Sequence, residues 1–334
     1  MSISAKEIAA RLGISPSAVS LALNDRAGVS EKTRKMVIDT AKELGYDMSK
    51  IRGTPILRGQ IVLLIFQKHG AVVSDTLFFS DLTNAILRAC RERRYTPLIH
   101  FVSKEDLIEQ ELRSILQSGA DGLILLGTEM RPEDFAPFYD FPLPMVVLDT
   151  YFDEMIWDCV EINNDQGAYL AARFLLRQQR GQPGYLRSSY PIRNFDERAD
   201  GFYKAIRDSG LSASQSIVHY LAPNPEGAYG DMKQLLADGV SIASCYFADN
   251  DLIATGAIKA FKEAGYRIPE DIAVIGFDNT SMCEMLDPPL TTINVPRQFM
   301  GRVAVEHLIS ILPAGDNNHL RLGIQVALVN RGTV

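Results

Sequence analysis

The feature that most constrains the fold is an alternation of short apolar runs with longer segments of helical pattern, which begins at Gln60. The apolar runs are Ile61–Phe66, Pro97–Val102, Leu123–Leu126 and Met145–Leu148, then Val160–Ile162, Gly184–Leu186, Ile217–Leu221, Ser244–Phe247 and Ile272–Phe277. Such alternation is typical of parallel sheets. Because the series falls into two similar halves, we predict an α/β body of two doubly wound parallel-sheet subdomains. Ligands bind such sheets at the carboxyl ends of the strands, so a cleft is expected between the subdomains.

The first sixty residues carry a different pattern, marked by three helix start signals. Ser4 and Glu7 have the spacing of a capping box, Ser15 precedes a proline at the first helical position, and Ser30 precedes a third helix. Gly13 permits a tight turn between the first two helices. Three short helices joined in this way predict a helix-turn-helix head, whose second helix lies in the major groove of DNA. A small structural three-helix cap is the alternative.

Charge is divided unevenly between these two parts. The whole chain has a net charge of −7, whereas residues 1–58 hold ten Lys or Arg and six Asp or Glu. The head region is therefore +4 and the remainder −11. A basic head on an acidic body is typical of a polyanion-binding module joined to a sensing module. A charge of +4 is weak beside the basic faces expected of DNA-binding proteins, so chance scatter is an equal alternative on charge alone.

Length and composition exclude several other classes. A chain of 334 residues suggests two or three domains, and 46% hydrophobic with 22% charged residues is ordinary for a globular protein. No run of about 18 uncharged apolar residues is present, and the N-terminus lacks the apolar core of a signal peptide, so we expect a cytoplasmic protein. The four cysteines, Cys90, Cys159, Cys245 and Cys283, are far apart and predict neither a disulfide nor a zinc site. We expect no metal and no cofactor.

Three other functions compete with a DNA-binding regulator. An enzyme is the first, but the chain has no G-x-x-x-x-G-K-[ST], no G-x-G-x-x-G after a strand, no G-x-S-x-G and no H-E-x-x-H motif, and its five histidines are dispersed. We therefore predict that it is not an enzyme. A solute-binding receptor would carry a signal peptide in place of the helical head. A structural adaptor would show DNA retention that does not depend on salt.

Residues 5–46, AKEIAARLGISPSAVSLALNDRAGVSEKTRKMVIDTAKELGY, resemble the head of the lactose-repressor (LacI/GalR) family of bacterial transcription regulators. The body is similar to the effector domain of that family, which itself resembles a periplasmic sugar-binding protein. The motifs that carry the second resemblance are VEINN at 160–164, NFDERADGF at 194–202, FADND at 247–251, IPEDIAVIGFD at 268–278 and LTTI at 290–293. Head and body together cover essentially the whole chain.

The resemblance implies which head residues meet DNA. Those expected to hold phosphates are Ser15, Ser20, Asn24, Ser30, Thr33 and Arg34, and we include Ser4 in the DNA-binding set. Those expected to read base edges are Pro16, Ser17 and Leu21. Many members of the family carry Arg at the position of Leu21, and leucine offers only apolar contact, for instance to a thymine methyl group. Operator preference at that base should therefore differ from that of the arginine-bearing relatives.

Residues 47–59 form the expected linker. Members of the family place a hinge helix here, whose leucine wedges into the minor groove. Gly53 and Pro55 oppose a helix, and the segment is about two residues shorter than is usual in the family. Ile51 or Leu57 could act as the wedge, and a flexible tether without base contacts is an equal alternative.

The resemblance also implies how the chain is divided. We expect a head at 1–46, the linker at 47–59 and an effector-binding body at 60–334. The chain should cross between the two subdomains near 157–162, 287–292 and 312–323. The first subdomain would then contain about 60–158 and 291–314, and the second about 159–288 and 320–334.

Position and resemblance together select the residues of the cleft. Asp149 and Asp278 each follow an apolar strand, and Asn250 follows Phe247 in the same way. We place Arg198 in the first turn of its helix, where the dipole disfavours a cation and a polar partner is needed. The full predicted effector set is Phe78, Phe79, Asp149, Asn194, Arg198, Phe247, Asn250 and Asp278. Asp249, Asn250 and Asp278 could instead cap turns or helices, Arg198 could form a structural ion pair, and the phenylalanines could belong to the core.

The sequence therefore predicts a homodimeric, sequence-specific regulator of transcription that acts as a repressor on a palindromic DNA operator. Its operator binding would be controlled by a small effector, a sugar or sugar derivative. A purine nucleobase is the main alternative, because phenylalanine stacking beside arginine and aspartate would suit a purine. The sequence does not specify the effector, the direction of its effect or the genes controlled.

Overall fold

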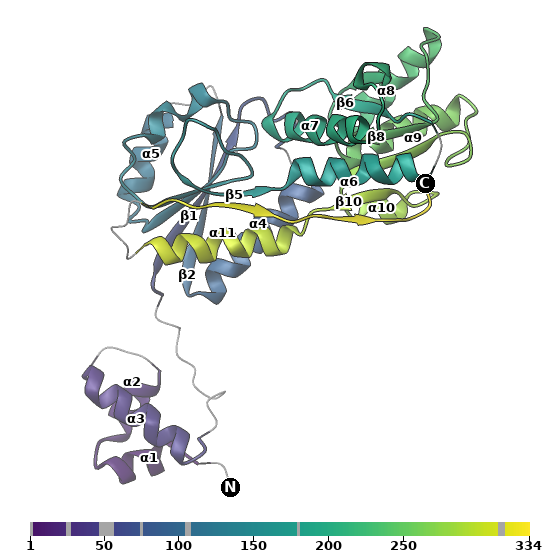
Figure 1. Cartoon of the computed structure of the whole chain (residues 1–334). Coiled ribbons are helices and arrows are strands. Elements are labelled where there is room, and N and C mark those ends of the chain that lie inside the picture. The colour runs from purple at the N-terminus through teal and green to yellow at the C-terminus, as the bar shows by residue number, and fades with distance from the viewer. Residues whose placement is uncertain are drawn as a thin grey trace. The chain divides into compact units, whose positions relative to one another are not determined.

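The computed structural model describes residues 3–24, 28–46, 57–73, 76–103, 108–178, 181–312 and 318–334. The chain divides into two compact units, residues 1–59 with 93–96 and the rest of the chain. We call residues 3–46 the head and residues 60–334 the body. Figure 1 shows the elements of each.

The head is the predicted three-helix unit, with α1 (Ala5–Leu12), α2 (Pro16–Leu23) and α3 (Glu31–Glu43). Its core is formed by Ile8, Val19 and Val37, which are fully buried. At the start of α1 the Glu7 carboxylate accepts hydrogen bonds from the amide and the hydroxyl of Ser4, at 2.6 and 2.8 Å. Gly13 has φ +65°, the left-handed conformation that ends α1 and starts the tight turn.

The first sheet of the body has the strand order β11-β5-β4-β3-β1-β2. Its strands are β1 (Gly59–Gln67), β2 (Tyr95–Ser103), β3 (Gly122–Leu126), β4 (Met145–Leu148), β5 (Asp158–Ile162) and β11 (Arg321–Ile324). The helical segments that accompany it are α4 (Leu77–Glu92), α5 (Ile108–Gln117), the 3₁₀ segment η2 (Pro132–Phe138) and α11 (Arg297–Ile311). The central strands β3 and β4 are buried along their whole length, as expected for a parallel sheet covered on both faces.

The second sheet has the order β12-β10-β9-β8-β6-β7. Its strands are β6 (Gly184–Ser188), β7 (Val218–Leu221), β8 (Cys245–Ala248), β9 (Ala273–Asp278), β10 (Thr291–Asn294) and β12 (Ala327–Val329), of which β12 is antiparallel to β10. Its helices are α6 (Asn164–Arg177), α7 (Arg193–Asp208), α8 (Pro225–Ala237), α9 (Asp251–Glu263) and α10 (Met282–Met285), with a short 3₁₀ turn η3 at Ala213–Gln215. Helices α6 and α7 pack closely at Gly201, where a Cβ atom would overlap the carbonyl group of Asp165.

The predicted class of two doubly wound sheets is confirmed, and the chain crosses between them at or just after the end of each expected range. Strand β5 pairs with β4 along Val146–Leu148, so all of β5 belongs to the first sheet. Strand β10 pairs with β9, so residues 291–294 belong to the second sheet rather than the first. The last segment then adds β11 to the first sheet and β12 to the second, and Figure 1 shows it in yellow running from one to the other. Strand pairing thus places the crossings after Ile162, at the end of its expected range, and after Asn294 and Ile324, just beyond theirs.

Candidate effector cleft and DNA-binding surface

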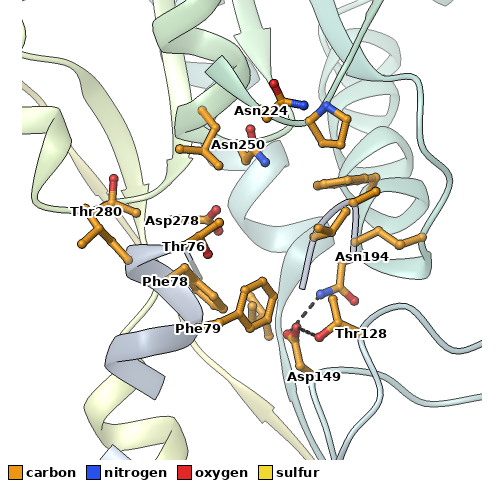
Figure 2. Close-up of a pocket in the computed structure, with 18 of the residues that line it drawn as sticks. Thr76, Phe78, Phe79, Thr128, Asp149, Asn194, Asn224, Asn250, Asp278 and Thr280 are labelled. Atoms are coloured by element: carbon orange, nitrogen blue, oxygen red, sulfur yellow. Dashed lines mark hydrogen bonds between the residues drawn. The ribbon is translucent and has the colours of Figure 1, made fainter. Parts of the chain in front are cut away.

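A cavity of about 280 Å³ lies within the body, at the carboxyl ends of strands from both sheets. Thr128 follows β3 and Asp149 follows β4 in the first sheet, whereas Asp278 ends β9 in the second. Figure 2 shows these side chains around the cavity, with Asn194 and Asn250. The structure therefore brings together residues that are more than a hundred positions apart in the sequence.

Asp149 lies at the point where the two halves of the body meet. Its carboxylate accepts hydrogen bonds from the hydroxyl of Thr128 at 2.6 Å and from the side-chain amide of Asn194 on α7 at 3.0 Å. Burial raises the pKa of Asp149 to about 6, although both hydrogen bonds favour the charged form. Its φ of +65° is unusual for a residue other than glycine and indicates a conformation held by its surroundings.

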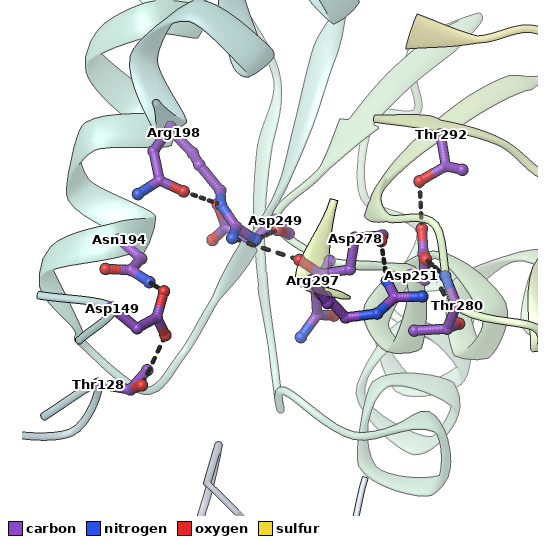
Figure 3. Close-up of polar contacts among 12 residues, drawn as sticks. Thr128, Asp149, Asn194, Arg198, Asp249, Asp251, Asp278, Thr280, Thr292 and Arg297 are labelled. Atoms are coloured by element: carbon purple, nitrogen blue, oxygen red, sulfur yellow. Dashed lines mark hydrogen bonds and ion pairs between the residues drawn. The ribbon is translucent and has the colours of Figure 1, made fainter. Parts of the chain in front are cut away.

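Arg198 is the cation of the site, and its side chain is only 3% exposed. Its guanidinium donates to the side-chain oxygen of Asn164 at 2.9 Å and to the backbone carbonyl of Asp249, and it lies 3.4 Å from the carboxylate of Asp278 (Figure 3). It also stacks on the ring of Phe277 at 3.7 Å. Because α7 begins at Arg193, Arg198 lies in its second turn, so our placement in the first turn was wrong. Burial, rather than the helix dipole, accounts for its need of polar partners.

Asp278 occupies the opposite wall, in a strained backbone conformation. It has φ +109° and Asn279 has φ +53°. The guanidinium of Arg297, at the start of α11, donates to the carbonyl oxygens of both residues and holds this turn. Burial raises the pKa of Asp278 to about 7, and the nearby charge of Arg198 opposes that effect.

Two further carboxylates lie behind the cavity and serve the framework. Asp249 is fully buried and accepts from the hydroxyl of Tyr185 and from the amide of Ser188 at 2.6 Å. Asp251 accepts from the amide of Thr280 at 2.9 Å and from the hydroxyl of Thr292 at 2.5 Å (Figure 3). These contacts tie the loops that carry the cavity residues to the second sheet.

Asn250 both caps a helix and lines the cavity. Its side-chain oxygen accepts from the amide of Ile253 at 2.8 Å at the start of α9, as the capping alternative predicted. Its amide NH₂ remains the group that it can offer to a ligand. Asn224 does the same at the start of α8, where its oxygen accepts from the amide of Gly227 at 2.8 Å.

The predicted aromatic walls are only partly present. Phe78 and Phe79 on α4 line the cavity and meet edge to face, with ring centroids 5.0 Å apart. Phe247 does not line it. Its ring is fully buried and stacks on those of Tyr185 and Phe202, because β8 is covered on both faces and this side chain points into the core under the helices.

Several cavity residues were missed by sequence reasoning. Thr128 follows the apolar run Leu123–Leu126, so the strand-end argument that selected Asp149 would have found it. Asn224 precedes a proline and carries a helix start signal. Glu129 gave no signal, yet its buried carboxylate accepts from the amides of residues 69, 70, 72 and 73 at 2.7 to 3.0 Å. It thereby fixes the loop after β1 that brings Ala71 and Val72 to the cavity.

The head presents the predicted DNA-contacting residues on its surface. Pro16, Ser17 and Ser20 are exposed, whereas Leu21 is half-buried, and a Cβ atom added to Gly28 would lie 3.2 Å from its Cδ1. Ser15 caps α2, accepting from the amide of Ala18 at 3.1 Å. The remaining hydroxyl and amide groups bond locally: Ser30 to Thr33 at 2.7 Å, and Asn24 to the carbonyl of Ser20 at 2.8 Å. Arg34 donates to the carbonyl of Ala22 at 3.4 Å.

Two linker residues had been named as wedges. Leu57 is 54% exposed, and Ile51 lies outside the described residues. Among the helices that the structure describes, none is both long and apolar enough to cross a membrane. Within the same described ranges, no cluster of His, Cys, Asp or Glu has the arrangement of a metal site.

A helix-turn-helix head followed by a two-sheet body with a polar cleft defines a DNA-binding transcription regulator controlled by a small molecule. Residues 4–49 match the family described as bacterial regulatory proteins, lacI family, and residues 167–334 match the periplasmic binding protein-like domain. The chain belongs to the LacI/GalR family of bacterial transcription regulators. It is thus a sequence-specific DNA-binding regulator under allosteric control by an effector, and the helical head separates it from a solute receptor.

Individual relatives are similar over nearly the whole chain. The HTH-type transcriptional repressor PurR of Pectobacterium carotovorum subsp. carotovorum is 29% identical, over 98% of this chain and 96% of its own. The HTH-type transcriptional regulator GalS of Salmonella typhimurium is 29% identical, over 91% and 88%. These relatives are transcription regulators rather than enzymes.

Solved structures show the same fold. The complex of the transcriptional regulator CelR with cellobiose has a TM-score of 0.73 at 24% identity, covering 99% of this chain and 100% of that one. A LacI family regulator from Enterococcus faecium with bound ribose has a TM-score of 0.69 at 26% identity, covering 81% and 98%.

Proposed function

We propose that the protein represses transcription in the cytoplasm by binding, as a homodimer, a short palindromic operator. One small head buries too little surface for tight specific binding, whereas two heads related by symmetry can meet successive half-sites. A structural neighbour, the lac repressor, is described as a dimer bound to operator; at 21% identity it supports the fold, and the dimer is our proposal for this chain.

Operator contacts would divide between two groups of residues on the head. Ser4, Ser15, Ser20, Asn24, Ser30, Thr33 and Arg34 would hold phosphates, and Pro16, Ser17 and Leu21 would read bases. A filter-binding titration against salt tests this, because log affinity should fall with log salt at a slope of about −0.9 per phosphate neutralised. Affinity that does not change with salt, or full affinity from a monomer, would contradict the proposal.

The effector, in our proposal, is a small hydroxyl-rich molecule, a sugar or sugar derivative. The observation that carries this is the convergence of Asp149, Asn194, Arg198, Asn250 and Asp278 on one cavity of about 280 Å³. Carboxylate and amide groups accept from and donate to vicinal hydroxyls in pairs, and Phe78 with Phe79 offers an apolar wall for a sugar ring. The cellobiose and ribose named for two structural neighbours agree with a sugar.

A purine remains the second candidate, because a phenylalanine edge beside Arg198 and Asp278 also suits a nucleobase. A thermal-shift screen of sugars, sugar phosphates and nucleobases separates the two, since a ligand at about 100 times its dissociation constant adds roughly 2.7 kcal/mol. Stabilisation by a purine alone would overturn the sugar assignment.

Variants test the location of the site. Asp278→Ala should remove the stabilisation by the sugar, and Asp200→Ala, an exposed carboxylate on α7 outside the cavity, should keep it. Equal stabilisation of both variants would place the ligand elsewhere. Binding should also close the two subdomains and alter operator affinity, to the extent that the ligand prefers one arrangement.

A further inference from the structure

A second pocket lies in the first subdomain and shares no lining residue with the effector cavity. Its volume is about 170 Å³, and it is formed between η2, the segment that joins β4 to β5, and β11. The lining side chains that matter here are Phe135, Val147, Phe152, Met155, Trp157 and Cys159. The pocket is partly open to solvent, since Asp153 and Arg321 in its lining are exposed, and a small molecule can therefore reach it.

Most of the walls of the pocket are aromatic or apolar. The ring centroid of Phe135 lies 5.1 Å from that of Trp157 and 5.8 Å from that of Phe152. Val147 and Cys159, on the neighbouring strands β4 and β5, are buried beneath them. Aromatic walls of this kind suit small aromatic molecules, whose rings pack edge to face or offset against them.

The two charged side chains in the lining, Arg321 and Asp153, are already paired with groups outside it. Arg321 donates from Nε to the carboxylate of Glu161 at 2.5 Å, and Arg193 contacts the carboxylate of Asp153 at 3.3 Å. A ligand with its own charge would have to compete with these pairs and lose hydration as it entered. An uncharged ligand meets neither cost.

Tyr151 connects the pocket to the second subdomain. Its ring lines the pocket and lies between two guanidinium groups, with that of Arg321 at 3.1 Å and that of Arg193 at 3.6 Å from the ring centroid. Arg193 belongs to α7 of the second subdomain. A molecule in the pocket would therefore touch a side chain that takes part in a contact between the two subdomains.

We infer that this pocket is a second ligand site, which takes an uncharged molecule with a single aromatic ring. It is separate from the effector cleft, and a molecule bound there would lie beside the Tyr151–Arg193 contact.

The test uses iodobenzene and the fluorescence of Trp157, which is the only tryptophan of the 334-residue chain. Iodine quenches tryptophan emission on contact, and Trp157 lines this pocket and not the effector cavity. Titration of the full-length protein should give saturable quenching. Toluene, which has the same ring and no iodine, should restore the emission competitively.

A matched pair of variants locates the binding. Cys159→Met fills the pocket and should weaken iodobenzene binding by about tenfold, the effect of losing burial of roughly two methylene groups. Cys159→Ala leaves the space open and should bind as the unaltered protein does. If the quenching of the unaltered protein does not saturate, or if toluene does not reverse it, the inference is wrong. This outcome does not depend on whether Cys159→Met folds. Equal affinity in both folded variants would overturn it too.

Discussion

The head and the cleft use their polar residues in opposite ways. In the head, Ser17 and Ser20 are exposed and bond only to near neighbours in the sequence. In the cleft, Asp149, Arg198 and Asp278 are withdrawn from solvent and bonded to residues far away in the chain. The head can therefore change its DNA preference at little cost in stability, whereas the cleft residues contribute both to ligand binding and to the fold.

The largest effect should come from Arg198→Ala. Removing this cation leaves Asp278 without its partner and Asn164 and the Asp249 carbonyl without a donor, so we expect a loss of about 3–5 kcal/mol in the stability of the body. Chemical denaturation followed by circular dichroism measures it. Arg207→Ala, on the exposed face of the same helix, should change stability by no more than about 0.5 kcal/mol. Equal losses of stability in the two variants would show that the buried contacts of Arg198 contribute no more to stability than an exposed arginine does.

A pH dependence should come next in size. Burial raises the pKa of Asp278 to about 7, above its value in the unfolded chain, so the folded state binds a proton that the unfolded state releases. This contribution is fully present below the unfolded pKa and is lost as the pH rises through about 7. We expect Asp278 by itself to account for a loss of about 2–4 kcal/mol in the stability of the body between pH 5 and 8, measured without effector as the difference from its non-ionising variant.

The control for that prediction is Asp278→Asn, which cannot ionise. It should weaken the dependence between pH 6 and 8, where Glu161 also titrates because burial raises its pKa to about 7. It should leave the part below pH 6 that Asp149 and Asp249 cause, since burial raises the pKa of each to about 6. An unchanged profile between pH 6 and 8 in Asp278→Asn would show that Asp278 is not the group that titrates.

A smaller effect is expected on the DNA side. Leu21→Arg should change the preferred base at one position of each half-site by about 1–3 kcal/mol, because arginine pairs bidentately with guanine. Nonspecific binding should stay the same or rise slightly. Selection from randomised DNA measures the change. Leu21 is half-buried, so identical motifs from both proteins would mean that this side chain serves the head's packing rather than base reading.

The smallest effect is local to one helix start. Ser15→Ala removes the cap on the amide of Ala18 and should cost about 1 kcal/mol, measured on the thermal transition of the head. Ser17→Ala, which removes a hydroxyl that caps nothing in the described structure, should leave that transition in place. If Ser17→Ala lowered the stability of the head more than Ser15→Ala does, exposed residues of the head would also contribute to its stability.

The sequence predicted the head more fully than the cleft, and the reason is physical. Caps and turns such as Ser15 and Gly13 depend on residues three or four positions away, so local spacing is enough to identify them. The strand-end rule found Asp149 and Asp278 because the end of an apolar run is also a local feature. The strand-end rule did not predict the position of Phe247 correctly. Its strand is covered on both sides, and which face a side chain takes there depends on the packing of distant helices. The loop anchored by Glu129 and the start of α7 depend on tertiary contacts in the same way.

The three crossings between the sheets affect the order in which the protein is completed on the ribosome. All residues of the head have been synthesised once the chain reaches residue 46. The first sheet is complete only after β11 (Arg321–Ile324), and the second only after β12 (Ala327–Val329). Domains near the N-terminus fold first during synthesis. A chain cut before Ala327 would therefore carry an intact head on a body whose second sheet lacks β12 at one edge.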